Sequence, residues 1–61
     1  MKRPFQIWVT NLTTSEIEVI DDISDYYYVD YELFSRFLFS RLKKYFDMQI
    51  PIKLELVYKK Y

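Results

Sequence analysis

The sequence contains no cysteine, no histidine and no glycine among its 61 residues. The absence of cysteine excludes a disulfide framework, a thiol nucleophile and a thiolate metal site. The absence of histidine removes the commonest metal ligand and the side chain that titrates near neutral pH. The absence of glycine excludes the glycine-rich loops that cradle phosphate groups. We therefore expect a protein that is not an enzyme and that binds neither a metal ion nor a cofactor.

Long apolar runs are absent too. No stretch of the sequence approaches the ~18 apolar residues that a membrane-spanning helix needs. After Lys2 and Arg3, residues 4–12 are interrupted by Gln6 and Thr10, which does not fit the apolar centre of a signal peptide. We expect no association with a membrane and a cytoplasmic location, in the cytoplasm of a host cell if the protein is viral.

Aromatic and charged side chains are abundant instead. Aromatic residues make up 21% of the chain, and residues 1–61 are enough for one small domain. The nine basic and nine acidic residues cancel, so net charge does not indicate a nucleic-acid partner. The charges are nevertheless segregated along the chain. From Glu16 to Glu32 there are seven acids and no base, whereas from Leu33 to Tyr61 there are seven bases and two acids.

Three segments have the alternating pattern of β-strands. Phe5, Ile7 and Val9 alternate with their neighbours, and the clearest alternation runs over residues 52–59. Residues 11–15 are predicted to form a polar loop.

Residues 16–21 are interpreted as a second strand, with Ile17 and Val19 facing the core. A capping box of Ser15 and Glu18 leaves a helix in this segment as the alternative. The β-branched residues favour the strand.

A helix is predicted to start at Asp30, whose side chain suits the N-cap position, and to run to residue 46 or 47. Residues 23–29 fit a strand, a helical extension or a loop. The order strand, strand, helix, strand then predicts an α+β domain. With a right-handed crossover, its three-stranded antiparallel sheet has the order 2-1-3, and one amphipathic helix packs on one face.

This arrangement leaves more apolar surface than the domain can bury. The predicted helix is apolar over roughly 240° of its circumference, with Phe37 on one flank and Phe39 and Phe46 on the other. The residues expected on the helix side of the sheet are Phe5, Ile7, Val9, Ile17, Val19, Ile52, Leu54 and Leu56. Those expected on the open side are Gln6, Trp8, Leu12, Glu16, Glu18, Ile20, Lys53, Glu55 and Val57. Because contiguous exposed apolar surface marks association sites, we expect a protein partner, a second copy of the chain as a homodimer, or both.

The most unusual stretch is the acidic tyrosine segment, residues 21–32, which interleaves five acids with four tyrosines. Tyrosines offer a large, rigid contact area with a polar tip, and the acids offer a phosphate-like field to a basic groove. Alternatively, the tyrosines pack under the start of the helix and the acids keep a loop hydrated.

Arg41 falls inside the apolar arc of the helix, where it fits either an interface contact or a side chain that lies along the edge of the core. The predicted partner-binding residues are Trp8, Asp21, Asp22, Asp25, Tyr26, Tyr27, Tyr28, Asp30, Phe37, Phe39, Arg41 and Phe46.

Three functional hypotheses follow. The favoured one is a non-catalytic binding protein that docks on a macromolecule. In its specific form, the protein comes from a virus or mobile element and inhibits a host enzyme. The alternative is a homodimeric nucleic-acid-binding protein, with Trp8 as a stacking platform. Its predicted contact residues are Arg36, Lys43, Lys44, Lys53 and Lys59. The acids expected around Trp8 on the open side would repel phosphates, so a protein partner is favoured over a nucleic acid. A third hypothesis is a structural subunit whose apolar faces are buried in a permanent assembly.

Overall fold

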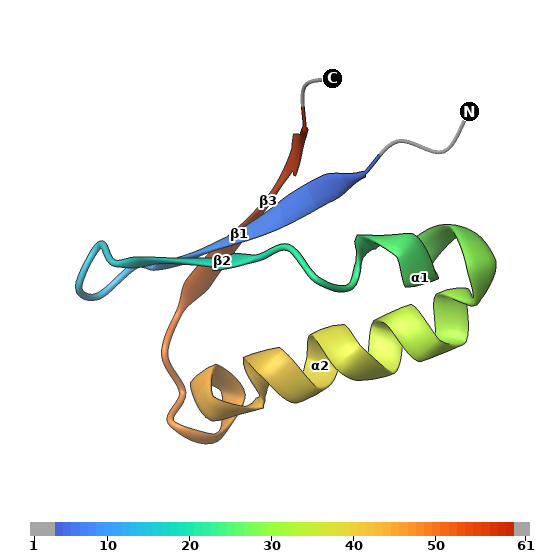
Figure 1. The fold of residues 1–61 in the computed structure, drawn as a ribbon. Helices are drawn as coiled ribbons and strands as arrows, with labels where there is room; N and C mark the ends of the chain where they lie inside the picture. The colour runs from blue at the N-terminus through green and yellow to red at the C-terminus, as the bar shows by residue number, and fades with distance from the viewer. Residues whose placement is uncertain (1–3, 60–61) are drawn as a thin grey trace.

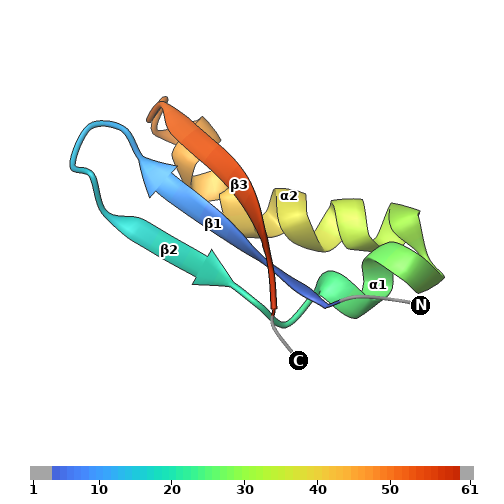
Figure 2. The ribbon, with the colours of Figure 1, turned by 90° about the horizontal axis from the view of Figure 1, so that it is seen from above.

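The computed structural model describes residues 4–59 and shows a small α+β fold (Figure 1). Its elements, in chain order, are β1 (Phe5–Asn11), β2 (Ile17–Ile20), α1 (Ser24–Val29), α2 (Tyr31–Asp47) and β3 (Ile52–Tyr58). The strands form one antiparallel sheet of order β2-β1-β3, and both helices lie on the same side of it (Figures 1 and 2). The predicted fold class and sheet order are confirmed. The ambiguous residues 23–29 contain the short helix α1.

Asp30 links the two helices. Its N–H donates to the Tyr26 carbonyl over 2.7 Å and closes α1, while its side chain accepts from the Leu33 N–H over 3.2 Å and caps α2. The N-cap predicted from the sequence is therefore confirmed.

Among residues 4–59, two non-glycine residues take the left-handed backbone conformation, since the chain contains no glycine. Ser15 has φ 65° in the loop between β1 and β2, where the Asn11 side chain also accepts from the N–H groups of Thr13 and Thr14. Gln49 has φ 56° after α2, and the Ile50 N–H then donates to the Tyr45 carbonyl over 2.8 Å. Local hydrogen bonds stabilise both turns at positions that glycine usually fills.

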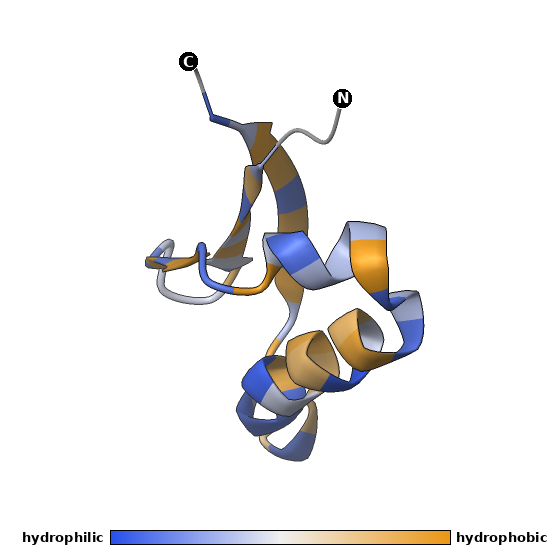
Figure 3. Ribbon diagram, turned by 45° about the vertical axis from the view of Figure 1, so that its right-hand side comes forward, coloured by the Kyte–Doolittle hydropathy of each residue, from blue (hydrophilic) through white to orange (hydrophobic). Residues whose placement is uncertain are grey.

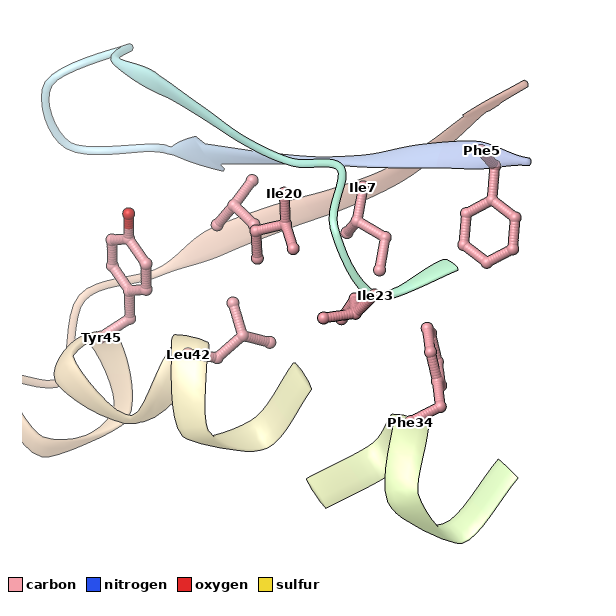
Figure 4. Packing of buried hydrophobic residues seen from close by; sticks show 8 residues of the cluster. Phe5, Ile7, Ile20, Ile23, Phe34, Leu42 and Tyr45 are labelled. Atoms are coloured by element: carbon pink, nitrogen blue, oxygen red, sulfur yellow. The ribbon is translucent and has the colours of Figure 1, made fainter. Parts of the chain in front are cut away.

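The core lies between β1 and the two helices. β1 contributes its alternate residues Phe5, Ile7 and Val9, which are almost completely buried. Figure 4 shows Phe5 and Ile7 pointing toward α2, and Phe34 and Leu42 of α2 pointing toward the sheet. The remaining buried hydrophobic residues are Ile20, Ile23, Phe34, Leu42 and Tyr45.

The two faces of β2 are the reverse of those predicted. β1 pairs Ile7 with Ile20 and Trp8 with Val19, and directly paired residues share a face. Ile20 is therefore in the core, with 2% of its surface exposed, whereas Ile17 is 52% exposed on the open face. Alternation by itself allows either face, and the choice is made by the register. In the observed register Ile20 joins the nearby Ile23 in the core.

The sheet twists, so that β3 rises away from α2 toward its C-terminal end (Figure 1). Leu54 and Leu56 pair with Val9 and Ile7, so they do lie on the helix side, as predicted. They are nevertheless 45% and 52% exposed, because no element of the described chain covers that part of β3. The two leucines are thus on the predicted side but uncovered, whereas Ile52 packs against the core.

Removing one methyl group from a residue on each face of β2 tests which face is buried. Ile20→Val should lower the free energy of unfolding by about 0.5–1.5 kcal/mol, because it leaves a cavity in the core. The matched change Ile17→Val, on the exposed face, should alter it by less than about 0.5 kcal/mol. Urea denaturation of both variants measures the difference. A larger effect at Ile17 than at Ile20 would contradict the register.

Candidate protein-binding surfaces

Part of the acidic tyrosine segment serves the fold itself. The rings of Tyr27 and Tyr28 pack edge-on against Phe5, at centroid distances of 5.5 and 6.2 Å. Tyr27 also packs against Phe34 of α2 at 5.3 Å. These two tyrosines close the end of the core beneath the start of α2, which matches the packing alternative. Together with Asp30, they have a structural task, whether or not a partner also contacts them.

Four other predicted residues come together at a surface depression, which we name the aromatic hollow. Tyr26 of α1 packs edge-on against Phe37 of α2, at 5.0 Å between centroids, and both rings remain exposed. Beside these rings, Arg41 Nη2 lies 2.6 Å from Asp22 Oδ2. With Ile23, these residues line a hollow of about 230 Å³. The sequence places Asp22 and Arg41 19 residues apart, so it does not indicate their pairing.

The Asp22–Arg41 pair is exposed on both sides, and such pairs contribute little to stability. The hydrogen bond from Arg41 lowers the pKa of the Asp22 carboxyl, and the same bond raises the pKa of Arg41. Both groups are therefore charged at neutral pH. The pair places the Arg41 guanidinium group at the rim of the hollow. Asp21 and Asp25 are exposed nearby in the chain and add negative charge.

The opposite flank of α2 carries a second exposed aromatic pair. The rings of Phe39 and Phe46 lie 5.3 Å apart, and Phe39 is 61% exposed. Arg41 and Lys44 reach toward β2 and its following loop, as their ion pairs with Asp22 and Glu18 show. At 100° per residue, Phe39 and Phe46 then project from the flank that faces away from β2. We call these two residues, with Leu54 and Leu56 of β3, the apolar flank.

Trp8 lies half-buried on the open face of the sheet, where its Nε1 donates to Gln6 Oε1 over 3.0 Å. Val19 and Glu55 flank it directly on the neighbouring strands. Glu16 and Glu18 were expected on this face, and that expectation is wrong. Glu18 pairs with Val9 on the helix side, and the alternation along β2 places Glu16 there too. The reversal of β2 thus removes two of the three acids expected around Trp8.

The basic residues of the nucleic-acid hypothesis are divided between the two sides of the sheet. Arg36 is paired with Glu32 over 2.9 Å, and Lys44 with Glu18 over 2.9 Å. Lys43 is exposed on α2. Lys53 pairs with Thr10 on the open face, and the alternation along the chain places Lys59 on that face too. The structure therefore does not gather these five residues into one basic surface.

A polar contact that sequence reasoning missed joins β2 to α2. Glu18 Oε1 accepts from Tyr45 Oη over 2.7 Å and from Lys44 Nζ over 2.9 Å. The hydrogen bonds from Lys44 and then Tyr45 lower the pKa of the Glu18 carboxyl. The bond to Glu18 raises the pKa of both Lys44 and Tyr45. No sequence signal marks this contact, because it depends on which face of β2 carries Glu18.

Within residues 4–59, no cluster of acidic side chains is suited to holding a metal ion, and no helix is long and apolar enough to cross a membrane. Comparison of the chain with protein-family models, with curated proteins and with solved structures finds no match.

The Glu18 contact predicts a pH-dependent contribution to stability. Because its pKa is lowered in the folded state, the stabilisation is fully present above the ordinary carboxyl value of 4.5. It is lost as the pH falls through the lower folded-state pKa. Glu18→Gln should therefore be less stable than the unmodified protein at pH 7, by a modest amount since the site is partly hydrated. Unfolding curves at several pH values should show the two proteins converging in acid. A difference that persists there would contradict the assignment.

Proposed function

We propose that this protein acts by binding another protein, without a catalytic step, and that the aromatic hollow is the centre of its docking surface. The observation that carries the proposal is the exposed Tyr26–Phe37 pair beside the Asp22–Arg41 ion pair. Tyrosine and arginine are enriched where protein interfaces concentrate their binding energy. The two rings give an apolar floor, and the ion pair gives a polar rim.

The size and charge of the hollow indicate the chemistry of the partner. Small-molecule sites usually measure ~300–1,000 Å³. At about 230 Å³ the hollow is smaller and suits one inserted side chain. Asp21, Asp22 and Asp25 outnumber Arg41, so the surroundings are negative. We infer a partner that presents an apolar or aromatic side chain next to basic residues.

In its more specific form, the proposal is that the partner is a host enzyme and that the chain inhibits it. Catalytic groups are not needed for this role, since a small domain inhibits by occupying a surface that the enzyme requires. A basic groove that normally holds phosphate groups would match the acids of the segment. The nucleic-acid hypothesis has less support, because its five basic residues lie on two sides of the sheet.

Site-specific photo-crosslinking tests the docking surface. Phe37 is replaced by p-benzoylphenylalanine in one variant, and Leu12, exposed in the loop after β1, is replaced in a control. In cells that express the chain, irradiation should give a discrete adduct at position 37 and none of the same mass at position 12. The result expected from the structure is a position-dependent contact, since only position 37 lines the hollow.

The charge requirement is tested in the same cells. The double change Asp21→Lys and Asp25→Lys, added to the position 37 variant, should reduce the adduct at least about tenfold. Asp30 and Asp22 are left unchanged because they cap α2 and pair with Arg41. Circular dichroism checks that the fold is kept. The proposal would be refuted if no adduct formed at position 37, or if the charge reversal left the amount of adduct unchanged.

A further inference from the structure

The hydrogen bonds at the two ends of β3 define the direction in which its backbone groups point. The Lys59 N–H donates to the Pro4 carbonyl over 3.1 Å, and the Leu12 N–H donates to the Pro51 carbonyl over 3.0 Å. Odd-numbered residues of β3 thus bond to β1. In an antiparallel pair these groups alternate, so the N–H and C=O groups of Ile52, Leu54 and Leu56 point to the outer edge. Among the described strands, none pairs with β3 on that side.

The same residues carry exposed apolar side chains. Leu54 and Leu56 lie on the helix side of the sheet and are about half exposed. Phe39 and Phe46 of α2 complete the apolar flank on the side away from β2. Figure 3 shows hydrophobic residues recurring along β3 between hydrophilic ones. An outer backbone edge and an apolar surface therefore lie side by side.

β3 lacks a bulge and an internal proline, two of the features by which edge strands commonly avoid pairing. It pairs with β1 in an unbroken register over seven residues, without a bulge, and Pro51 precedes the strand. Lys53 projects from the open face and leaves the apolar side uncovered. The other edge strand, β2, has only four residues, and its Glu18 is bound to α2. Of these two edges, β3 is the one suited to accept another strand.

We propose that β3 of a second copy of this chain pairs antiparallel with β3 along this edge, making a continuous six-stranded sheet across a two-fold axis. A pairing centred on Leu54 sets each Lys53 opposite Glu55 of the second copy. It also sets Ile52 opposite Leu56, and Pro51 at a position that needs no N–H. Pairing centred on Glu55 would place the two glutamates face to face, and pairing centred on Leu56 would oppose Lys53 and Lys59.

The charge pattern makes a second copy the best occupant of the edge. Its own strand supplies both the opposite charges and the apolar residues that the Leu54-centred register requires. The two α2 helices then lie on the same side of the joined sheet, and their Phe39–Phe46 flanks face each other. The aromatic hollow lies on the other flank of α2, so this inference is independent of the proposed docking function.

Total chemical synthesis permits a test that leaves every side chain unchanged. N-methylation of the Leu54 amide removes an outward N–H at the centre of the proposed pair, without touching a bond to β1. N-methylation of the Val19 amide is the matched control. Asn11 donates to the Glu16 carbonyl, so even-numbered residues of β2 bond to β1 and the Val19 N–H points to the outer edge of β2. Sedimentation equilibrium measures the mass of each protein.

The unmodified chain and the Val19 control should sediment at twice the 7.6 kDa mass of one chain at micromolar concentration. The Leu54 variant should have a dissociation constant at least about tenfold higher, since two hydrogen bonds are lost and two methyl groups collide. A monomeric unmodified chain would overturn the proposal and leave the edge to a strand of another protein. A dimer that survives N-methylation at Leu54 would overturn it as well.

The register has its own test. Lys53→Glu and Glu55→Lys should each weaken the dimer, since each sets like charges opposite one another, and the double variant should restore it. Circular dichroism checks folding in each case. Failure of the double variant to restore the dimer would overturn the Leu54-centred pairing.

Discussion

The two helices leave part of one face of the twisted three-stranded sheet uncovered, and the rest of this structure follows from that constraint. The core forms where β1 lies closest to α2, around Phe5, Ile7 and Val9. Because the sheet twists, β3 diverges from α2, and Leu54 and Leu56 stay exposed on the side that would otherwise be core. The apolar surplus is thus a result of geometry as well as of composition.

The same constraint gives α2 two different flanks. One flank is tied to β2 and the loop after it through the Lys44–Glu18 and Arg41–Asp22 contacts, and it borders the aromatic hollow. The other flank carries Phe39 and Phe46 and faces away from β2. The two proposals use these flanks separately, so binding to a partner and self-association do not compete for one surface. A two-fold dimer would present two copies of the hollow.

The ion pairs that join distant parts of the chain, Arg41–Asp22 and Lys44–Glu18, lie at the surface. Exposed ion pairs add little stability, so the fold depends on the eight-residue core and on the tyrosines that close it. Two of the four tyrosines in the acidic tyrosine segment accordingly pack against the core. Tyr27 and Tyr28 seal the core at Phe5, whereas Tyr26 turns toward Phe37 and the solvent. Neighbouring tyrosines of identical chemistry therefore have different surroundings.

The sequence by itself determined the features that depend on local chemistry. The Asp30 cap, the extent of α2, the strands β1 and β3 and the sheet order all follow from capping, alternation and chain connectivity. Only the tertiary structure decided which face of β2 is buried, because a period of two fits both faces equally until Ile20 meets Ile23. It also decided the helical state of residues 24–29 and the pairing of Asp22 with Arg41. These depend on packing between segments distant in sequence, which local patterns do not encode.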